Sequence, residues 1–327
     1  MTRVSLIGTL LNEAQSVVAL LDSIVAQSRA PDEIVLVDGG SRDGSADAIR
    51  AWSARHPALH LRLLVEPGAN ISRGRNLAAA AASGDVFAIT DCGVVLPPDW
   101  LERLVAPFES SHPPEAVSGF FAADPRSLFE FALGAATLPG RSEIRPESFL
   151  PSSRSFAISR AAWWRSGGYP EWLDYCEDLI LDLNLRRLGI KFAWVPGAEV
   201  RFRPRDSPRA FALQYFRYAR GDGKADLWRK RHTIRYLAYL GGPVLLRLAP
   251  RRWAIPLLAL GACFYLRQPA RRLLERRDSR SLGELMLAAA MLPWLIALGD
   301  IAKMAGYPVG VLWRLRQHPP DWRVQGQ

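Results

Sequence analysis

The stretch from Ile34 to Ser45, IVLVDGGSRDGS, places the strongest constraint on the fold. Its first four residues are apolar and mostly β-branched, which is typical of a buried parallel strand, and Asp38 follows them directly. In open α/β sheets, ligands bind outside the carboxyl ends of the strands. We therefore predict that Asp38 lies at a binding site. An ordinary strand-to-helix turn, with Asp43 and Ser45 capping the next helix, is the alternative.

The first 95 residues alternate between short apolar segments and segments with helical periodicity. Strands are expected at 4–8, 34–37, 61–65 and 86–90, with helices between them at about 17–25, 46–54 and 72–82. This alternation predicts an α/β fold whose mostly parallel sheet is flanked by helices. Beyond residue 97 the pattern is weaker: strands are expected at 116–121, 155–159 and 191–195, and helices at 128–135 and 177–188. Residues 138–153 read as a long loop, which is often a binding element.

Charge divides the chain into two parts. Residues 1–200 hold 18 Lys/Arg and 24 Asp/Glu, a balance of −6, whereas residues 201–327 hold 24 and 8, a balance of +16. In the basic part the arginines are interleaved with apolar runs, which fits an anionic membrane surface better than nucleic acid. The predicted organisation is a catalytic domain over 1–204 with halves at about 1–95 and 96–204, an amphipathic coupling segment over 205–235, and a membrane-associated helical region over 236–327.

Three apolar runs in the basic part bear on how it meets a membrane. Leu237–Leu248 and Trp253–Leu266 are shorter than the roughly 20 residues that span a bilayer, so interfacial or re-entrant helices are expected, with a spanning hairpin as the alternative. Leu282–Leu298 is nearer to spanning length. The segment Arg267–Arg280 carries six arginines against two acids and is expected to be a loop on the cytosolic side. No signal peptide is recognised, so the first 200 residues are expected in the cytosol.

Acidic residues stand out at three places in the sequence. Asp38 and Asp91 each follow a predicted strand directly, and the pair Glu177 and Asp178 opens a predicted helix. An enzyme that handles a nucleoside diphosphate needs acceptors for base and ribose, positive charge or a metal for the phosphates, and a base for the attacking group. The three cysteines, Cys92, Cys176 and Cys263, are too scattered for a disulfide framework or a zinc site.

Together these segments resemble a glycosyltransferase of family 2, with the GT-A fold. The matching segments, in the family's order, are VDGGSRDGS, SRGRNLA at 72–78, TDCG at 90–93, GGYPEW at 167–172, CEDLILDLNLRRLG at 176–189 and QYFRYARGDG at 214–223. The resemblance covers about residues 3–223. It implies an inverting, membrane-associated enzyme on the cytosolic side that moves a sugar from a nucleotide-diphosphate sugar to a lipid-linked or cell-surface polysaccharide acceptor.

The same resemblance assigns a donor site. It would place Thr9, Glu13, Asp38 and Asp43 around the nucleoside, and Arg73, Arg75 and Asn76 near the donor, where guanidinium groups bind diphosphate oxygens. Solvated charges at a helix start are the alternative for the arginines. Enzymes of this fold usually carry Asp-x-Asp, but here Gly93 occupies the third position. Magnesium or manganese could still be bound by Asp91 together with the substrate's phosphates.

On the acceptor side, the family's Glu-Asp motif corresponds to Glu177 and Asp178. By resemblance Asp178 is the base that takes the acceptor's proton, whereas a helix-capping role is the alternative. Asp182, one turn further, is expected to face solvent or to belong to the capping shell. The remaining assignments, on the acceptor or diphosphate side, are Arg154, Trp172, Gln214 and Arg217, with ordinary packing as the alternative for Trp172 and for the helix around Gln214.

Two other functions compete with this interpretation. Gly93 in place of an acid is compatible with a non-catalytic protein that binds nucleotide sugars. A nucleotide-dependent oxidoreductase would need Gly-x-Gly-x-x-Gly after the first strand, where this chain has GTLLNEA.

Overall fold

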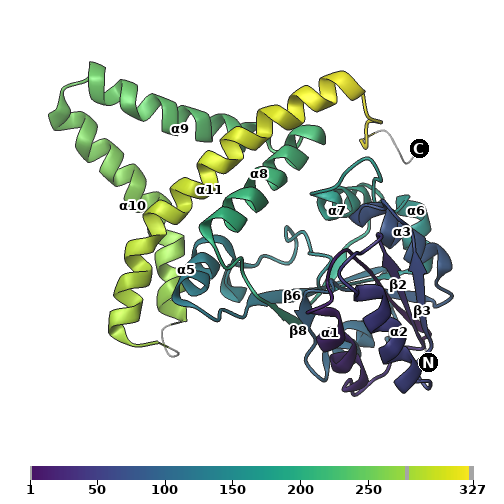
Figure 1. Cartoon of the computed structure of the whole chain (residues 1–327). Helices are drawn as coiled ribbons and strands as arrows, with labels where there is room; N and C mark the ends of the chain where they lie inside the picture. The colour runs from purple at the N-terminus through teal and green to yellow at the C-terminus, as the bar shows by residue number, and fades with distance from the viewer. Residues whose placement is uncertain (1, 277–279, 324–327) are drawn as a thin grey trace. The chain divides into compact units, whose positions relative to one another are not determined.

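The computed structural model describes residues 2–276 and 280–323, and these form two compact units (Figure 1). Of the described residues, the first unit contains 2–122, 141–202 and 319–323. The second contains residues 123–140 and 203–318. The second unit thus resumes at residue 203. It also takes in a mid-chain segment that the sequence pattern did not indicate.

The first unit is built on one sheet with the strand order β3-β2-β1-β4-β7-β6-β8-β5. The four strands predicted in the first 95 residues are confirmed, and they pair in parallel: β3 (Leu61–Val65), β2 (Glu33–Asp38), β1 (Val4–Leu10) and β4 (Val86–Ile89). The register pairs Leu10 with Asp38, so the carboxyl ends of β1 and β2 lie side by side.

The rest of the sheet corrects the expectation of a mostly parallel arrangement. β7 (Phe156–Ser159) runs antiparallel to β4 and to β6 (Ala116–Ala123), and β8 (Phe192–Phe202) runs antiparallel to β5 (Val94–Val95). Parallel neighbours need a crossover connection, usually a helix, and the regular alternation that supplies it ends with β4.

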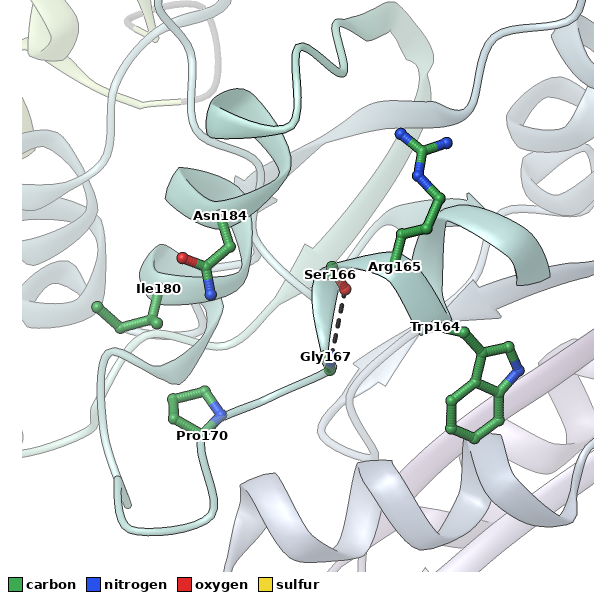
Figure 2. A pocket seen from close by; sticks show the side chains of 8 residues that line it. Trp164, Arg165, Ser166, Gly167, Pro170, Ile180 and Asn184 are labelled. Carbon is green, nitrogen blue, oxygen red and sulfur yellow. Dashed lines mark hydrogen bonds between the residues drawn. The ribbon is translucent and has the colours of Figure 1, made fainter. Parts of the chain in front are cut away.

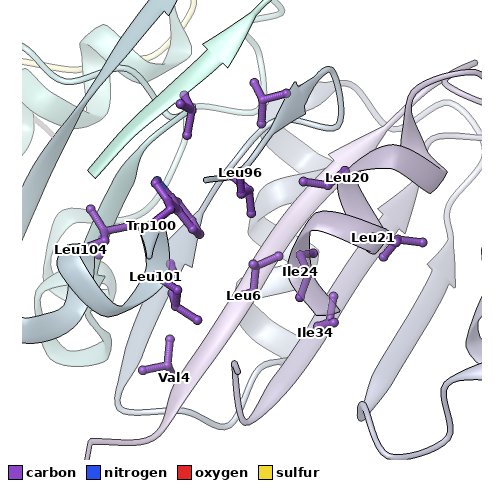
Figure 3. Close-up of a cluster of buried hydrophobic side chains, with 14 of the residues drawn as sticks. Val4, Leu6, Leu20, Leu21, Ile24, Ile34, Leu96, Trp100, Leu101 and Leu104 are labelled. Carbon is purple, nitrogen blue, oxygen red and sulfur yellow. The ribbon is translucent and has the colours of Figure 1, made fainter. Parts of the chain in front are cut away.

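Helices cover both faces of this sheet because successive side chains of a buried strand point to opposite sides. Leu6 and Leu36 belong to one core, with α1 (Val17–Val25), α2 (Ser45–Arg55) and α4 (Trp100–Val105), and Figure 3 shows part of it. The neighbouring residues Ile7 and Val37 belong to the other core. The helices of that second core are α3 (Ile71–Ala81), α6 (Arg160–Ser166) and α7 (Glu177–Arg187).

α3 packs so closely on β1 that Gly74 leaves no room for a side chain. A Cβ at Gly74 would lie 2.1 Å from Oγ1 of Thr9, whose hydroxyl donates to the carbonyl of Val37 at 2.9 Å. Gly74→Ala should therefore lower the free energy of unfolding by about 1–3 kcal/mol, as overpacking of a close-packed interior does. Urea unfolding measures this, with Gly93→Ala as the control because a Cβ there meets nothing within 4 Å. Equal stability of the two variants would contradict the packing argument.

The second unit is helical. It consists of α5 (Leu128–Thr137), α8 (Pro208–Lys224), α9 (Arg229–Leu248), α10 (Arg251–Glu275) and α11 (Leu282–Gln317), around a core that includes Phe131, Phe211 and Leu295. α8 and α11 lie side by side (Figure 1) with their backbones in close approach. A Cβ at Gly306 would lie 2.1 Å from the carbonyl oxygen of Phe216, and one at Gly310 would lie 2.0 Å from that of Arg220. Only glycine permits this approach.

Within the described residues, α11 is the helix that is long and apolar enough to cross a membrane, judged by length and composition. Its 36 residues extend well beyond the expected run Leu282–Leu298. α9 and α10 are also longer than their apolar runs. The predicted loop Arg267–Arg280 is wrong as far as Glu275, because α10 continues to that residue; 277–279 lie outside the described residues. Arginine is a good helix former, which explains why the helix extends past the apolar run.

Candidate active site

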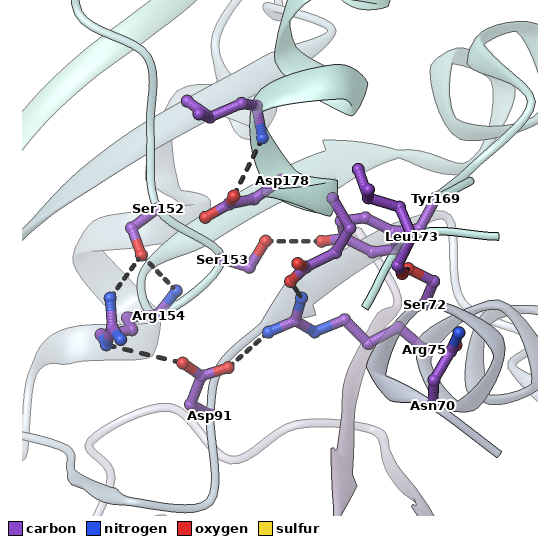
Figure 4. A network of polar contacts seen from close by, with 12 residues as sticks. Asn70, Ser72, Arg75, Asp91, Ser152, Ser153, Arg154, Tyr169, Leu173 and Asp178 are labelled. Atoms are coloured by element: carbon purple, nitrogen blue, oxygen red, sulfur yellow. Dashed lines mark hydrogen bonds and ion pairs between the residues drawn. The ribbon is translucent and has the colours of Figure 1, made fainter. Parts of the chain in front are cut away.

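A buried arginine joins two of the acidic segments that the sequence singled out. Arg75, on α3, is 2% exposed; its Nη2 lies 2.5 Å from Oδ1 of Asp91, and its Nη1 lies 2.7 Å from Oε1 of Glu177. Figure 4 shows its guanidinium group between the segment that follows β4 and the start of α7. The ring of Tyr169 lies beside it, with the centroid 5.0 Å from Cζ of Arg75. Arg75 is therefore the centre of a charged cluster.

A second arginine faces the other oxygen of Asp91. Nε of Arg154 lies 3.5 Å from Oδ2 of Asp91, and Nη1 of Arg154 donates to Oγ of Ser152 at 3.0 Å. Its guanidinium group also lies 4.5 Å from the ring centroid of Phe202. Burial of Asp91 raises its pKa, but the charges of Arg75 and Arg154 outweigh burial, so the pKa is below its ordinary value. Asp91 is thus ionised and held between two cations.

The pKa values of Glu177 and Asp178, the pair that opens α7, are raised, whereas that of Asp91 is lowered. Burial and the neighbouring charge of Asp178 raise the pKa of Glu177 to about 7, against the opposing charge of Arg75. Burial also raises the pKa of the half-buried Asp178, against Arg75 and Arg154, while its Oδ1 accepts a hydrogen bond from the backbone N–H of Leu179 at 2.9 Å. A carboxylate with a raised pKa next to two arginines is suited to accept a proton.

Asp182 does not face solvent, so that part of the expectation is wrong. It is 2% exposed, and its Oδ2 has no hydrogen-bond partner within the described part of the chain. Burial and the charge of Asp178 raise its pKa well above the ordinary value. The dense leucine pattern of α7 indicated burial of the helix, but it could not show which polar position is enclosed.

The acidic residues expected around a nucleoside organise the turns at the ends of β1 and β2. Oδ1 of Asp38, which is 1% exposed, accepts from the backbone N–H and the hydroxyl of Ser41 at 2.9 and 2.6 Å. Asp43 accepts from the backbone N–H of Ala14 at 2.9 Å, which ties the turn after β2 to the turn after β1. Glu13 belongs to the turn after β1, where its carboxylate accepts a hydrogen bond from the hydroxyl of Ser16.

Two other residues of α3, Asn76 and Arg73, contact the loop between α6 and α7, which approaches the charged cluster at Tyr169. Asn76 donates to the carbonyl of Tyr169 at 2.8 Å and accepts from its N–H at 2.9 Å, while Arg73 pairs with Glu66 at 2.6 Å and with Glu171 at 3.5 Å. Trp172 is half-buried on the same loop. Tyr169 belongs to the segment GGYPEW at 167–172 but was not among the predicted site residues. Its hydroxyl lies 2.7 Å from Oγ of Ser153, beside the charged cluster.

Comparison with known families identifies the domain. Residues 5–165 match the family described as Glycosyl transferase family 2. They include Asp38, Arg75, Asp91 and Arg154 from the site above. The chain carries a family 2 glycosyltransferase domain. Glu177 and Asp178 lie beyond the matched range.

Individual relatives are distant. The chain is 25% identical over 185 residues to validoxylamine A glucosyltransferase of Streptomyces hygroscopicus subsp. limoneus, and the match covers 54% of this chain and 37% of that protein. It thus spans little more than a third of that relative. It is 27% identical over 225 residues to succinoglycan biosynthesis protein ExoA of Rhizobium meliloti, covering 65% and 67% of the two chains.

A solved structure shows the fold. A mannosyltransferase from Pyrobaculum calidifontis, determined in complex with GDP-Man and Mn²⁺, superposes with a TM-score of 0.57 at 22% identity, covering 96% of this chain and 86% of that one. The fold of the family 2 domain is therefore of the GT-A type.

This domain offers few side-chain ligands for the metal that Asp91 was expected to bind. No group of three or more His, Cys, Asp or Glu that could hold a metal ion occurs among residues 2–276 and 280–323. Both oxygens of Asp91 face arginines, and burial raises the pKa of the adjacent Cys92 thiol far above its ordinary value. The side chains present do not fit a cation that the protein itself holds.

Two further features contain none of the residues of the charged cluster. Gln214 and Arg217 are on α8 of the second unit, where Nε2 of Gln214 donates to the hydroxyl of Tyr218 at 2.9 Å, and their expected role stays a prediction. Figure 2 shows a pocket of about 170 Å³ in the family 2 unit. It is lined by Trp164, Arg165, Ser166, Gly167, Gly168, Pro170, Ile180 and Asn184, so it contains none of the charged residues described above.

Proposed function

We propose that this protein is an inverting glycosyltransferase that moves a sugar from a nucleotide-diphosphate sugar to a lipid-linked or cell-surface polysaccharide acceptor. The observation that carries the proposal is the half-buried carboxylate of Asp178, with a raised pKa, in the same charged cluster as Asp91, Arg75 and Arg154. This cluster belongs to a unit that carries a family 2 domain and has the GT-A fold. The relative ExoA, named for succinoglycan biosynthesis, supports a polysaccharide acceptor.

The proposed reaction is a single displacement. The acceptor's hydroxyl oxygen forms a bond to the anomeric carbon while its proton passes to a carboxylate oxygen of Asp178. The bond between the anomeric carbon and the diphosphate oxygen breaks, and its electron pair leaves with the nucleoside diphosphate. Attack opposite to the leaving group inverts the anomeric centre. Arg154 neutralises charge on the departing diphosphate, and Asp38 is proposed to contact the base or ribose.

Attachment to the cytosolic face of the membrane is part of the proposal. α11 is apolar over most of its length, and only 28% of its most apolar window is buried in the described structure. α9 and α10 add exposed apolar side chains, including Leu237, Leu260 and Phe264. The excess of arginine in this part of the chain favours anionic lipid headgroups.

The decisive experiment measures binding and turnover of a panel of nucleotide sugars by the detergent-solubilised protein, with magnesium, manganese or a chelator. Release of nucleoside diphosphate from one donor, dependent on an acceptor, is expected. Binding of donors without turnover under any condition would favour the non-catalytic alternative, which Gly93 motivates. The oxidoreductase alternative predicts hydride transfer instead, and nothing in the charged cluster supports it.

The pH dependence of transfer should report the acid pair. Because Asp178 must be ionised to accept a proton, the rate should rise with pH through its raised pKa. The charge of Asp178 raises the pKa of Glu177, and this interaction between the two carboxyl groups is reciprocal, so Glu177→Gln should move the acidic limb to lower pH. The measurement is kcat against pH at saturating donor. The surface variant Glu115→Gln should leave the limb in place, and an unmoved limb in Glu177→Gln would rule out coupling of the pair.

A further inference from the structure

The charged cluster departs from the Asp-x-Asp arrangement in one specific way. Position 93, where the resemblance leads one to expect a second acid, is glycine, and a Cβ there would meet nothing within 4 Å. A Cβ is therefore accommodated, so crowding at the backbone does not account for glycine at this position. The segment after β4 thus presents one carboxylate, Asp91, which is held by two guanidinium groups.

The two arginines differ in what they can reach. Arg75 is 2% exposed and bridges Asp91 and Glu177, so it is enclosed by the protein. Arg154 is 24% exposed, so part of its guanidinium group is accessible to a ligand. Its orientation is fixed on several sides by Asp91, Ser152 and the ring of Phe202. A guanidinium group held in this way is suited to bind diphosphate oxygens without losing its contact with Asp91.

We propose that the positive charge that balances the donor's diphosphate is supplied by Arg154, which Asp91 orients, rather than by a divalent cation held by the protein. This inference rests on the proposed function, and it deepens it by assigning a role to the unusual Asp91-Cys92-Gly93 sequence. Asp91 then acts as a positioning residue for an arginine. Gly93 leaves the site without the second carboxylate of Asp-x-Asp, and both oxygens of the remaining one face arginines.

The test measures binding of UDP and GDP to the full-length, detergent-solubilised protein by calorimetry, with EDTA or with Mn²⁺. Paramagnetic resonance counts the Mn²⁺ bound to the protein in the same samples. The wild-type protein should bind one nucleoside diphosphate with the same affinity in EDTA, and without retaining Mn²⁺. Arg154→Gln should weaken diphosphate binding by about tenfold or more while leaving binding of the nucleoside alone unchanged, because only a charged hydrogen bond to phosphate is lost.

Gly93→Asp supplies the matched gain of function. It restores Asp-x-Asp at a position with space for the side chain, so this variant should bind Mn²⁺ together with the nucleoside diphosphate. Arg165→Gln, a surface arginine that pairs with Glu115, is the control for loss of positive charge. Stoichiometric Mn²⁺ in the wild-type complex, or loss of diphosphate binding in EDTA, would overturn the inference and leave the proposed function standing. Failure to bind any nucleoside diphosphate, with or without metal, would overturn both.

Discussion

Asp178→Asn should abolish sugar transfer while leaving donor binding intact. The amide keeps the shape of the side chain but cannot take the acceptor's proton, and loss of a general base lowers the rate by about two to four orders of magnitude. Its contact with the backbone N–H of Leu179 can be kept by the amide oxygen, so α7 should start as in the wild type. The measurement is acceptor-dependent release of nucleoside diphosphate, with calorimetry of donor binding on the same preparation.

Asp182→Asn is the control for this experiment, because it changes the same chemical group one turn along α7. Asp182 is buried and its pKa is raised, which favours the neutral form of the carboxyl group, so a neutral amide of similar size should be tolerated and activity largely kept. Full activity of Asp178→Asn would sink the assignment of the base. Equal loss in both variants would instead indicate that α7 has been perturbed, which the melting temperatures would reveal.

Arg75→Met should strongly destabilise the first unit. It leaves Asp91 and Glu177 without the cation that lies 2.5 and 2.7 Å from them, and removal of one partner from a buried ion pair costs about 3–5 kcal/mol. The expected result is a fall of this size in the free energy of unfolding, measured by urea denaturation and followed by tryptophan fluorescence. Transfer should be lost as well, because Asp91 and Glu177 would no longer be held in place.

A double variant separates loss of charge balance from loss of packing. Asp91 keeps its contact with Arg154 in Arg75→Met, whereas Glu177 loses its ion pair, so adding Glu177→Gln should restore part of the lost stability. Arg73→Met, two residues earlier on α3, should have a much smaller effect because Arg73 is 48% exposed and its ion pairs lie at the surface. If Arg75→Met were as stable as Arg73→Met, the bridge between Asp91 and Glu177 would not be a structural element.

The candidate site was only partly accessible from the pattern of residues. The segments that contain Asp38, Asp91 and Asp178 could be found because a polar residue directly after an apolar run, or at the start of a helix, stands out in the sequence. Which side chains pair with these acids could not be predicted in this way. Arg75 meets Glu177 from 102 positions away, and the contact of Arg154 with Asp91 spans a change of strand direction.

For the fold, the sequence by itself determined the parallel strands β1 to β4 with their helices and the basic, apolar character of the last third of the chain. These features are local, because apolar periodicity and charge are properties of neighbouring residues. Only the tertiary structure decided the antiparallel half of the sheet, the membership of α5 in the helical unit, the burial of Asp182 and the occupation of both oxygens of Asp91 by arginines. Each of these depends on which distant segments come together, and the sign of a pKa shift follows from that packing rather than from residue type.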